Sequence, residues 1–167
     1  DLSAILVTHE HADHISGVSA LSRRFGIPVY ATRGTARTNK LLGAAQLHWI
    51  DVDHPFHVGD LAINPVAVPH DAIEPCQFVF SAQDKTLGVM TDLGSISAHV
   101  HQAFSACDAL LLEANHDVDM LWAGKYPPSL KQRVSGDWGH LSNVQAAQFL
   151  QNITLDNLQT LVLGHMS

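Results

Sequence analysis

The sequence predicts an α/β fold in which short strands alternate with helices. Apolar, β-branched runs recur along the chain, and each ends near a cluster of polar residues. Between several of these runs, apolar residues recur with helical spacing. The 167 residues are 46% hydrophobic and 15% charged, which is typical of a globular chain. We therefore expect a single domain across residues 1–167.

The first half of the chain predicts elements of both kinds. Residues 4–8 form a short apolar run, expected to be a buried strand that ends at His9. Residues 15–25 have helical spacing, and Gly26 and Pro28 end that pattern. The elements expected next are a strand at 29–31, a helix at 35–42, and strands at 47–52 and 61–68.

The second half continues this alternation. A β-hairpin is expected from two apolar runs at 76–81 and 86–90 that flank a four-residue turn. Ser142 and Gln145 have the spacing of a capping box, which predicts a helix reaching about Leu150. The other expected elements are a helix at 98–104, a strand at 109–112, two short helical pieces within 120–134 and a strand at 158–163.

The composition contains twelve histidines, more than the nine lysines and arginines together. Histidine is the commonest metal ligand in proteins and titrates near neutral pH. The net charge of −7 argues against a non-specific nucleic-acid coat, although most basic residues cluster in two stretches. Cys76 and Cys107 form no C-x-x-C pair, which predicts buried thiols in a reducing, cytoplasmic compartment. No apolar stretch approaches the ~18 residues of a membrane helix, so no membrane association is expected.

One short segment carries the strongest chemical signal. It follows the first expected strand and contains His9, His11, Asp13 and His14. Three imidazoles and a carboxylate within six residues can point into one space, as a binuclear metal site requires. An isolated histidine is usually structural, but four potential ligands at this spacing indicate metal binding.

This segment resembles the H-x-H-x-D-H signature of the metallo-β-lactamase superfamily. Three later ligand positions of that family match residues that follow expected strands, namely His70, Asp92 and His165. The resemblance implies an αββα sandwich with two divalent metal ions, Zn²⁺ or Mn²⁺, at one edge. It also implies that His9, His11 and His70 hold one ion, that Asp13, His14 and His165 hold the other, and that Asp92 bridges them. Because the strands that usually precede the signature are missing, we expect residues 1–167 to be part of a longer domain that continues at both ends.

Two further segments are similar to the nuclease branches of the superfamily. They lie around Glu113, at the end of an expected strand, and around His140, just before an expected helix. The resemblance implies a proton-transfer pair in which Glu113 orients His140, and His140 protonates the leaving oxygen of a phosphodiester. Asp13 or Asp92 would accept the proton of the attacking water.

The whole string is most similar to the WalJ-type branch, small bacterial proteins regarded as DNA exonucleases. A nucleic acid is therefore the expected substrate. Its candidate contacts are His116, Lys131, Arg133 and Asn143. Trp49, Trp122 and Trp138 could stack on bases, but buried packing is the expected role of each.

Two other functions remain open. A carbonyl-directed hydrolase, such as a thioesterase, a glyoxalase II-like enzyme or a lactonase, would share the metal motif but leave Glu113 and His140 unexplained. A non-catalytic binding domain of the same fold would not need the full set of metal ligands.

Overall fold

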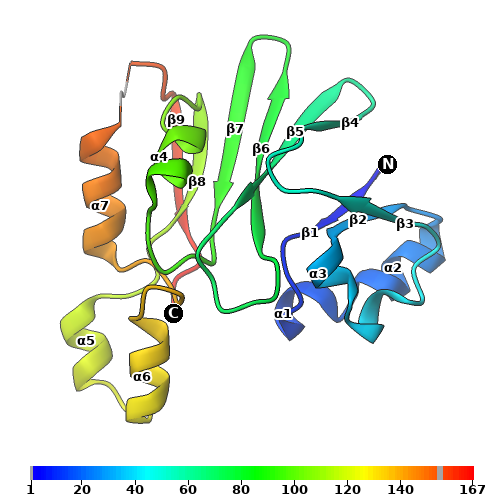
Figure 1. The fold of residues 1–167 in the computed structure, drawn as a ribbon. Helices are drawn as coiled ribbons and strands as arrows, with labels where there is room; N and C mark the ends of the chain where they lie inside the picture. Colours follow the sequence, from blue (N-terminus) through cyan, green and yellow to red (C-terminus); the bar gives the residue numbers. More distant parts are fainter. Residues whose placement is uncertain (1, 154–155) are drawn as a thin grey trace. The chain divides into compact units, whose positions relative to one another are not determined.

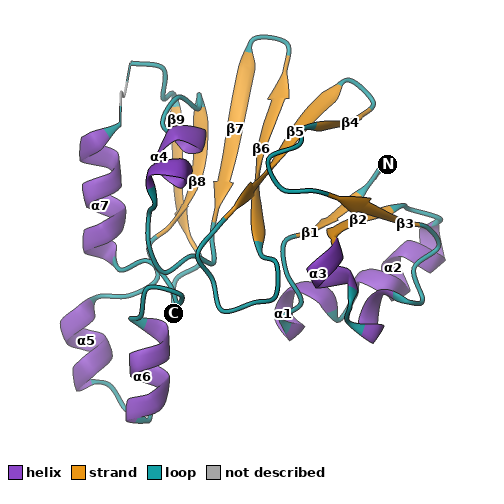
Figure 2. Cartoon of the chain, in the orientation of Figure 1, coloured by secondary structure: helices purple, strands orange, loops and turns teal. Residues whose placement is uncertain are grey.

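The computed structural model describes residues 2–153 and 156–167 (Figure 1). Contacts between residues divide the chain into two compact units. The first contains Asp1–Ala67 and Ala72–Phe78, and the second contains Val68–Asp71 and Val79–Ser167. Strands and helices alternate along the chain in both units, which confirms the predicted α/β class (Figure 2).

The first unit contains a parallel sheet with the strand order β1 (Ile5–Val7), β2 (Val29–Thr32), β3 (Leu47–Ile50). It also contains an antiparallel pair, β4 (Phe56–Val58) and β5 (Leu61–Ala67). Gly59, in the turn between these strands, has a φ of 59°, a conformation that glycine adopts without strain. The sequence analysis missed β4, because three residues are too few to show an alternation.

The helices of this unit are shorter than predicted. The helix expected at 15–25 is divided at Ser16 and Gly17 into α1 (Ala12–Ile15) and α2 (Val18–Phe25). The helix expected at 35–42 is wrong, since α3 (Arg33–Ala36) and the 3₁₀-helix η1 (Asn39–Leu41) occupy this stretch. Thr32 and Thr38 begin these elements, each accepting a backbone N–H with its hydroxyl oxygen. These two threonine caps therefore begin two short elements where one helix was expected.

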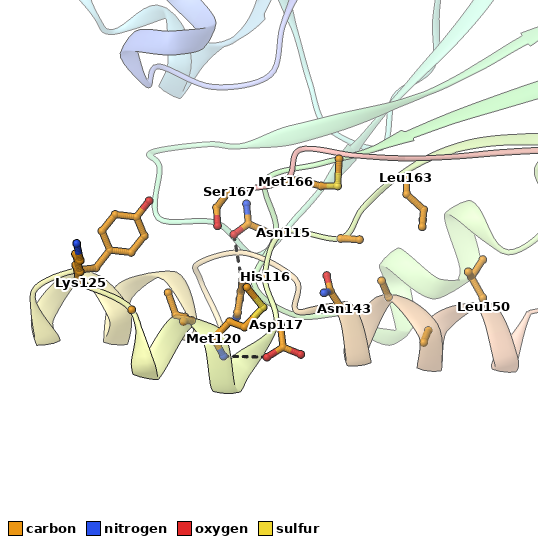
Figure 3. A pocket seen from close by; sticks show the side chains of 16 residues that line it. Asn115, His116, Asp117, Met120, Lys125, Asn143, Leu150, Leu163, Met166 and Ser167 are labelled. Carbon is orange, nitrogen blue, oxygen red and sulfur yellow. Dashed lines mark hydrogen bonds between the residues drawn. The ribbon is translucent and has the colours of Figure 1, made fainter.

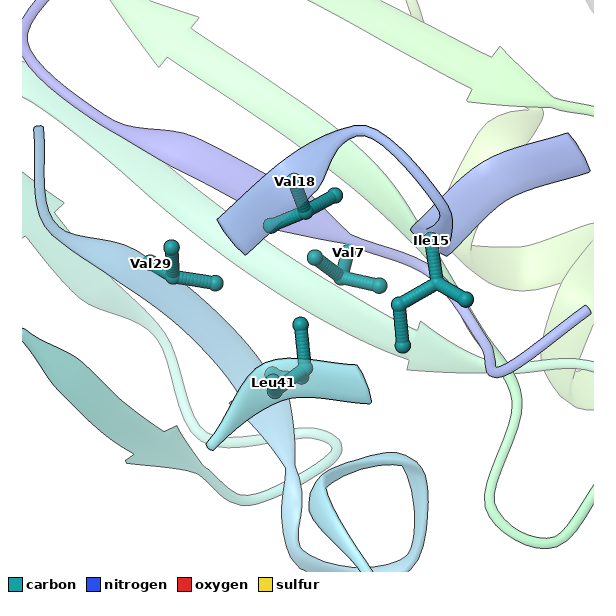
Figure 4. Close-up of a cluster of buried hydrophobic side chains, with 6 residues drawn as sticks. Val7, Ile15, Val18, Val29 and Leu41 are labelled. Atoms are coloured by element: carbon teal, nitrogen blue, oxygen red, sulfur yellow. The ribbon is translucent and has the colours of Figure 1, made fainter. Parts of the chain in front are cut away.

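A small hydrophobic core anchors the segment that contains His9, which connects β1 to α1. Figure 4 shows its side chains, which come from β1, α1, α2, β2 and η1. Its buried members are Val7, Ile15, Val18, Val29, Ala31 and Leu41. Because Val7 and Ile15 flank the His9–His14 segment in the sequence and are both buried, both ends of that segment are anchored.

The second unit contains the parallel strands β7 (Lys85–Met90), β8 (Ala109–Glu113) and β9 (Thr160–Gly164). Strand β6 (Cys76–Ala82) precedes β7, and the boundary between the units falls within it. In the register of these strands Met90 lies beside Leu112, and Glu113 lies beside Gly164. The carboxyl ends of β7, β8 and β9 therefore meet at one edge of the sheet.

The described part of this unit also contains four helices: α4 (Ala98–Phe104), α5 (Val118–Ala123), α6 (Pro128–Val134) and α7 (Asn143–Asn152). His101 of α4 contacts α7, with Nε2 lying 3.2 Å from the carbonyl oxygen of Asn152. Lys131 of α6 donates to the carbonyl oxygen of Trp122 in α5 at 2.7 Å. The predicted pair of short helices around Pro127 and Pro128 is confirmed.

Two expectations about side-chain burial have opposite outcomes. Cys76 and Cys107 are buried free thiols, as predicted, and burial raises the pKa of Cys76 to about 12. The expected burial of the tryptophans is wrong, because Trp49, Trp122 and Trp138 are all at least half exposed. Among the residues that the structure describes, no helix has the length and apolar character required to cross a bilayer.

The capping box of α7 makes a testable contribution to stability. The Ser142 hydroxyl accepts from the Gln145 backbone N–H, and the Gln145 side chain accepts from the Ser142 backbone N–H. We expect Ser142→Ala to lower the free energy of unfolding by about 1 kcal/mol, because it leaves helix N–H groups unsatisfied. Ser135→Ala, at an exposed position, is the control and should change it by less than about 0.5 kcal/mol. Urea denaturation measures both, and equal effects would contradict the capping role.

Candidate metal and proton-transfer site

The first unit places four of the predicted ligands on one turn after β1. The ring centroid of His9 lies 4.5 Å from that of His11 and 4.2 Å from that of His14. Asp13 Oδ2 lies 3.5 Å from His14 Nε2. His9 is buried whereas Asp13 is exposed, so the cluster runs from the interior to the surface. The local spacing in the sequence therefore predicted this grouping correctly.

The hydroxyl of Thr8 orients two of these rings. Its Oγ1 lies 3.0 Å from His9 Nδ1 and 3.4 Å from His14 Nδ1. Both rings are therefore held through Nδ1, which leaves the Nε2 side as the one that can coordinate a metal. Such a contact to the second ring nitrogen is typical of metal-ligating histidines.

The second unit brings the other predicted residues together at the carboxyl edge of its parallel strands. Asp92 follows β7, Glu113 ends β8 and His165 follows β9. Asp92 and His165 have positive φ angles of 52° and 55°, which are uncommon for residues other than glycine. Backbone strain of this kind is concentrated at functional sites. One ligand atom from each of Asp92, Glu113, His140 and His165 lies within 4.8 Å of the others.

Glu113 is the fully buried centre of this group. Its Oε1 lies 2.9 Å from His140 Nδ1 and 2.5 Å from His165 Nδ1. Its Oε2 accepts the backbone N–H groups of Leu141 at 2.9 Å and Leu93 at 3.3 Å. One carboxylate therefore fixes two imidazoles and two loops. The sequence analysis paired Glu113 with His140 but missed its bond to His165.

His70 and His165 both approach the carboxylate of Asp92 with Nε2. The distances to Asp92 Oδ1 are 4.0 Å for His70 and 3.4 Å for His165. His70 Nδ1 lies 3.0 Å from the carbonyl oxygen of Gly139, so its N–H donates there and Nε2 carries the lone pair. Asp92 thus lies between two imidazoles, and a hydrogen bond at Nδ1 fixes the orientation of each ring.

Close backbone packing positions the loops that carry these side chains. A Cβ on Gly94 would overlap the backbone of Gly136, Asp137 and Gly139. A Cβ on Gly139 would overlap the carbonyl groups of Arg133 and Val134. Gly94 therefore allows the loop after β7 to approach the loop before His140, and Gly139 allows that loop to pack against the end of α6.

The electrostatics of the site favour metal ligation. Burial alone would raise the pKa of Glu113, but hydrogen bonds from His140, His165 and the Leu141 amide hold it below its ordinary value. Burial lowers the pKa of His70, so this imidazole is neutral at neutral pH. Neutral imidazoles and ionised carboxylates are the forms that bind divalent metals. The donor set present therefore fits a divalent metal ion.

The predicted substrate contacts lie on the same unit. His116 is buried beyond the end of β8, and burial lowers its pKa. Asn143 is exposed at the start of α7. Lys131 bonds to Trp122, and Arg133 donates to Asp71 at 2.5 Å, so both cations also have partners within the protein. Asp71, which sequence reasoning did not single out, links Arg133 to the neighbourhood of His70, with its Oδ1 3.6 Å from His70 Nε2.

The charge on Glu113 predicts a dependence of stability on pH. Because its pKa is lower in the folded than in the unfolded chain, the ionised carboxylate stabilises the fold above its ordinary pKa of 4.5. This stabilisation is lost as the pH falls through the lower, folded-state pKa. We expect Glu113→Gln to remove this part of the pH dependence. Urea denaturation between pH 3 and pH 7 tests this, and parallel curves for the two proteins would contradict it.

Comparison with known proteins identifies the family. The family model described as "Beta-lactamase superfamily domain" matches residues 1–166. The chain is 38% identical over 173 residues to the exodeoxyribonuclease WalJ of Streptococcus pneumoniae and 36% identical over 171 residues to the exodeoxyribonuclease YycJ of Bacillus anthracis. Each alignment covers 100% of this chain and 64% or 65% of the relative.

The solved structures agree on the fold. Zn²⁺-bound PqqB from Methylobacterium extorquens superimposes with a TM-score of 0.77 at 20% identity, over 98% of this chain and 62% of that one. The family model and the two relatives show that the chain belongs to the metallo-β-lactamase superfamily, as the His9–His14 signature indicated. It spans about 64% of the length of the exonucleases that it resembles. Members of the family are typically metal-dependent, and the clusters described above are able to bind metal.

Proposed function

We propose that this chain is the catalytic part of a metal-dependent phosphodiesterase, an exonuclease that degrades DNA. The observation that carries the proposal is the buried Glu113 carboxylate, which bonds His140 and His165 beside Asp92. A metal-binding hydrolase of carbonyl compounds needs no such imidazole–carboxylate pair. Alignment of the whole chain to about two thirds of the length of two exodeoxyribonucleases supports the same activity.

The family motif supports the following ligand set. His9, His11 and His70 would hold one divalent ion, Asp13, His14 and His165 the other, and Asp92 would bridge them. Two Zn²⁺ or Mn²⁺ ions would supply positive charge at the phosphate and lower the pKa of a coordinated water. Contacts within each unit support this assignment. The rings of His9, His70 and His165 are each held through Nδ1, which leaves Nε2 to coordinate a metal ion.

The residues of the chain would then move the protons. His140, oriented through Nδ1 by Glu113, would protonate the leaving oxygen with Nε2. Asp13 or Asp92 would accept the proton of the attacking water. Lys131, Arg133 and Asn143 would contact the DNA backbone, where Lys131 and Arg133 add positive charge to a chain of net charge −7. The family model, which matches residues 1–166 as one domain, supports a single domain, and the free thiols fit a cytoplasmic location.

The experiment that tests this function uses a full-length protein. Hydrolysis of bis-p-nitrophenyl phosphate is measured first, followed by degradation of end-labelled DNA and RNA, with Zn²⁺ and Mn²⁺ supplied separately. We expect metal-dependent release of nucleotides from DNA ends. Turnover of thioesters or lactones without cleavage of any phosphodiester would instead establish a carbonyl-directed hydrolase. A protein that binds no metal would be a non-catalytic domain.

A further inference from the structure

The second unit contains a pocket of about 700 Å³ beyond the end of β8 (Figure 3). Its walls come from α5 and the residues after it, from α7, from β9, and from the residues that follow β8 and β9. Apolar side chains form much of the wall, among them Met120, Leu121, Leu150 and Leu163. A concave, mainly apolar site with a few polar groups is typical of small-molecule recognition. Its size is sufficient for a nucleoside.

The polar end of this pocket contains a buried imidazole. His116 is 5% exposed, and its Nδ1 lies 3.3 Å from Oδ1 of Asn115. Asn115 Nδ2 donates to the carbonyl oxygen of His165 at 2.8 Å, which assigns Oδ1 as the acceptor atom. The proton of His116 is therefore on Nδ1, and Nε2 is an acceptor. Within residues 2–153 and 156–167 this buried Nε2 has no hydrogen-bond partner.

We propose that the pocket binds the base of the terminal nucleotide of the DNA strand, and that His116 Nε2 accepts a hydrogen bond from the base. This inference rests on the proposed exonuclease function and names its substrate subsite. Thymine N3–H, guanine N1–H and the amino groups of adenine and cytosine all lie on the edge used for base pairing. One acceptor can therefore serve all four bases, as an enzyme that removes successive nucleotides requires.

The surroundings favour a base over a phosphate group. An acceptor nitrogen repels phosphate oxygens, and the apolar wall suits the faces of a base. Tyr126 also lines the pocket and is half exposed, so its ring is available for stacking, while Lys125 supplies a positive charge nearby.

The pocket is adjacent to the proton-transfer residues. Asn115 bonds to His165, and His116 follows Glu113 by three residues. A base in this pocket would lie next to the Glu113, His140 and His165 group.

The first test measures binding by the full-length protein without added metal. The probes are thymidine 5′-monophosphate and its N3-methyl derivative, which lacks the N–H donor. By isothermal titration calorimetry we expect the unmethylated nucleotide to bind about tenfold more tightly or better. His116→Phe, which keeps a ring but removes the acceptor, should abolish this preference. Equal affinity of the wild-type protein for both probes would overturn the inference.

A second pair of variants blocks the pocket without changing a buried residue. Ala147 is an exposed residue of α7 that lines the pocket, so Ala147→Phe should fill it. Val144→Phe, on the same helix but outside the pocket, is the matched control. We expect about tenfold weaker nucleotide binding in Ala147→Phe alone, in line with the loss of one stacked base. Equal binding by the two variants would also overturn the inference.

Cleavage distinguishes this inference from the proposed function. DNA with an abasic terminal residue is compared with normal DNA as a substrate. Faster cleavage of normal DNA, with the difference lost in Ala147→Phe, supports the pocket. Equal cleavage by the wild-type protein contradicts the pocket but leaves the exonuclease function intact. Binding of thymidine monophosphate without any cleavage supports the pocket and refutes the proposed function.

Discussion

Replacing Asp92 by Asn should lower phosphodiester turnover about a thousandfold or more, the equivalent of about 4 kcal/mol. The carboxylate has the Nε2 atoms of His70 and His165 on one oxygen, at 4.0 Å and 3.4 Å. Removing its charge would weaken the attraction for the divalent ions that Asp92 is proposed to bridge. Metal content, measured by plasma mass spectrometry on the full-length protein, should therefore fall together with kcat.

Asn is the informative substitution at this position because of the backbone. Asp92 has a φ of 52°, and Asn tolerates this left-handed conformation better than Ala does. A loss of activity in Asp92→Asn thus reports on the charge and not on a rearranged loop. Asp84→Asn, at an exposed position in the turn before β7, is the control. Normal metal content and turnover in Asp92→Asn would exclude Asp92 as a ligand.

Replacing His140 by Ala should reduce kcat on DNA by about 10²–10⁴, the usual contribution of a general acid. Metal content should remain unchanged, since His140 is oriented by Glu113 and is not among the proposed ligands. Added imidazole should restore part of the activity, and the limb of the pH–rate profile due to the acid should disappear. His99→Ala, at an exposed position on α4, is the matched control. An unchanged rate would remove His140 from the mechanism.

Substitution of Glu113 tests the positioning of His140 separately from the proton transfer by His140. It holds His140 at 2.9 Å through the same oxygen that contacts His165, so Glu113→Gln should affect both rate and metal affinity. A second-sphere partner of this kind is worth about 10–100-fold in affinity or activity. In Glu113→Gln/His140→Ala the losses in rate should be less than additive, because the two residues act as a unit. Full additivity would show that Glu113 acts independently of His140.

Much of the candidate site could be predicted because its signals are local. His9, His11, Asp13 and His14 lie within one turn, and their spacing alone brought them together. Asp92, Glu113 and His165 were identified by their resemblance to family positions at the ends of expected strands, and parallel strands place these ends at one edge. The capping box at Ser142 was predicted for the same reason, since a cap depends on residues three positions apart.

Other features depend on contacts between distant residues. The bond between Glu113 and His165 joins positions 52 residues apart and depends on the register of β8 and β9. Trp49 and Trp138 were expected to be buried because they are apolar, but both are exposed. Burial depends on which other residues pack against a side chain, and the sequence does not show this. The helix expected at 35–42 failed because Thr38 begins a new element with its own hydroxyl.

By itself, the sequence determined the α/β class and the superfamily signature at His9–His14, both of which depend on local order along the chain. Only the tertiary structure decided that Glu113 binds two histidines, that His70 and His165 converge on Asp92, and that the buried His116 bonds Asn115 through Nδ1. The physical reason is that hydrogen-bond partners and burial are set by strand register and loop packing. Both of these join residues that are far apart in the sequence.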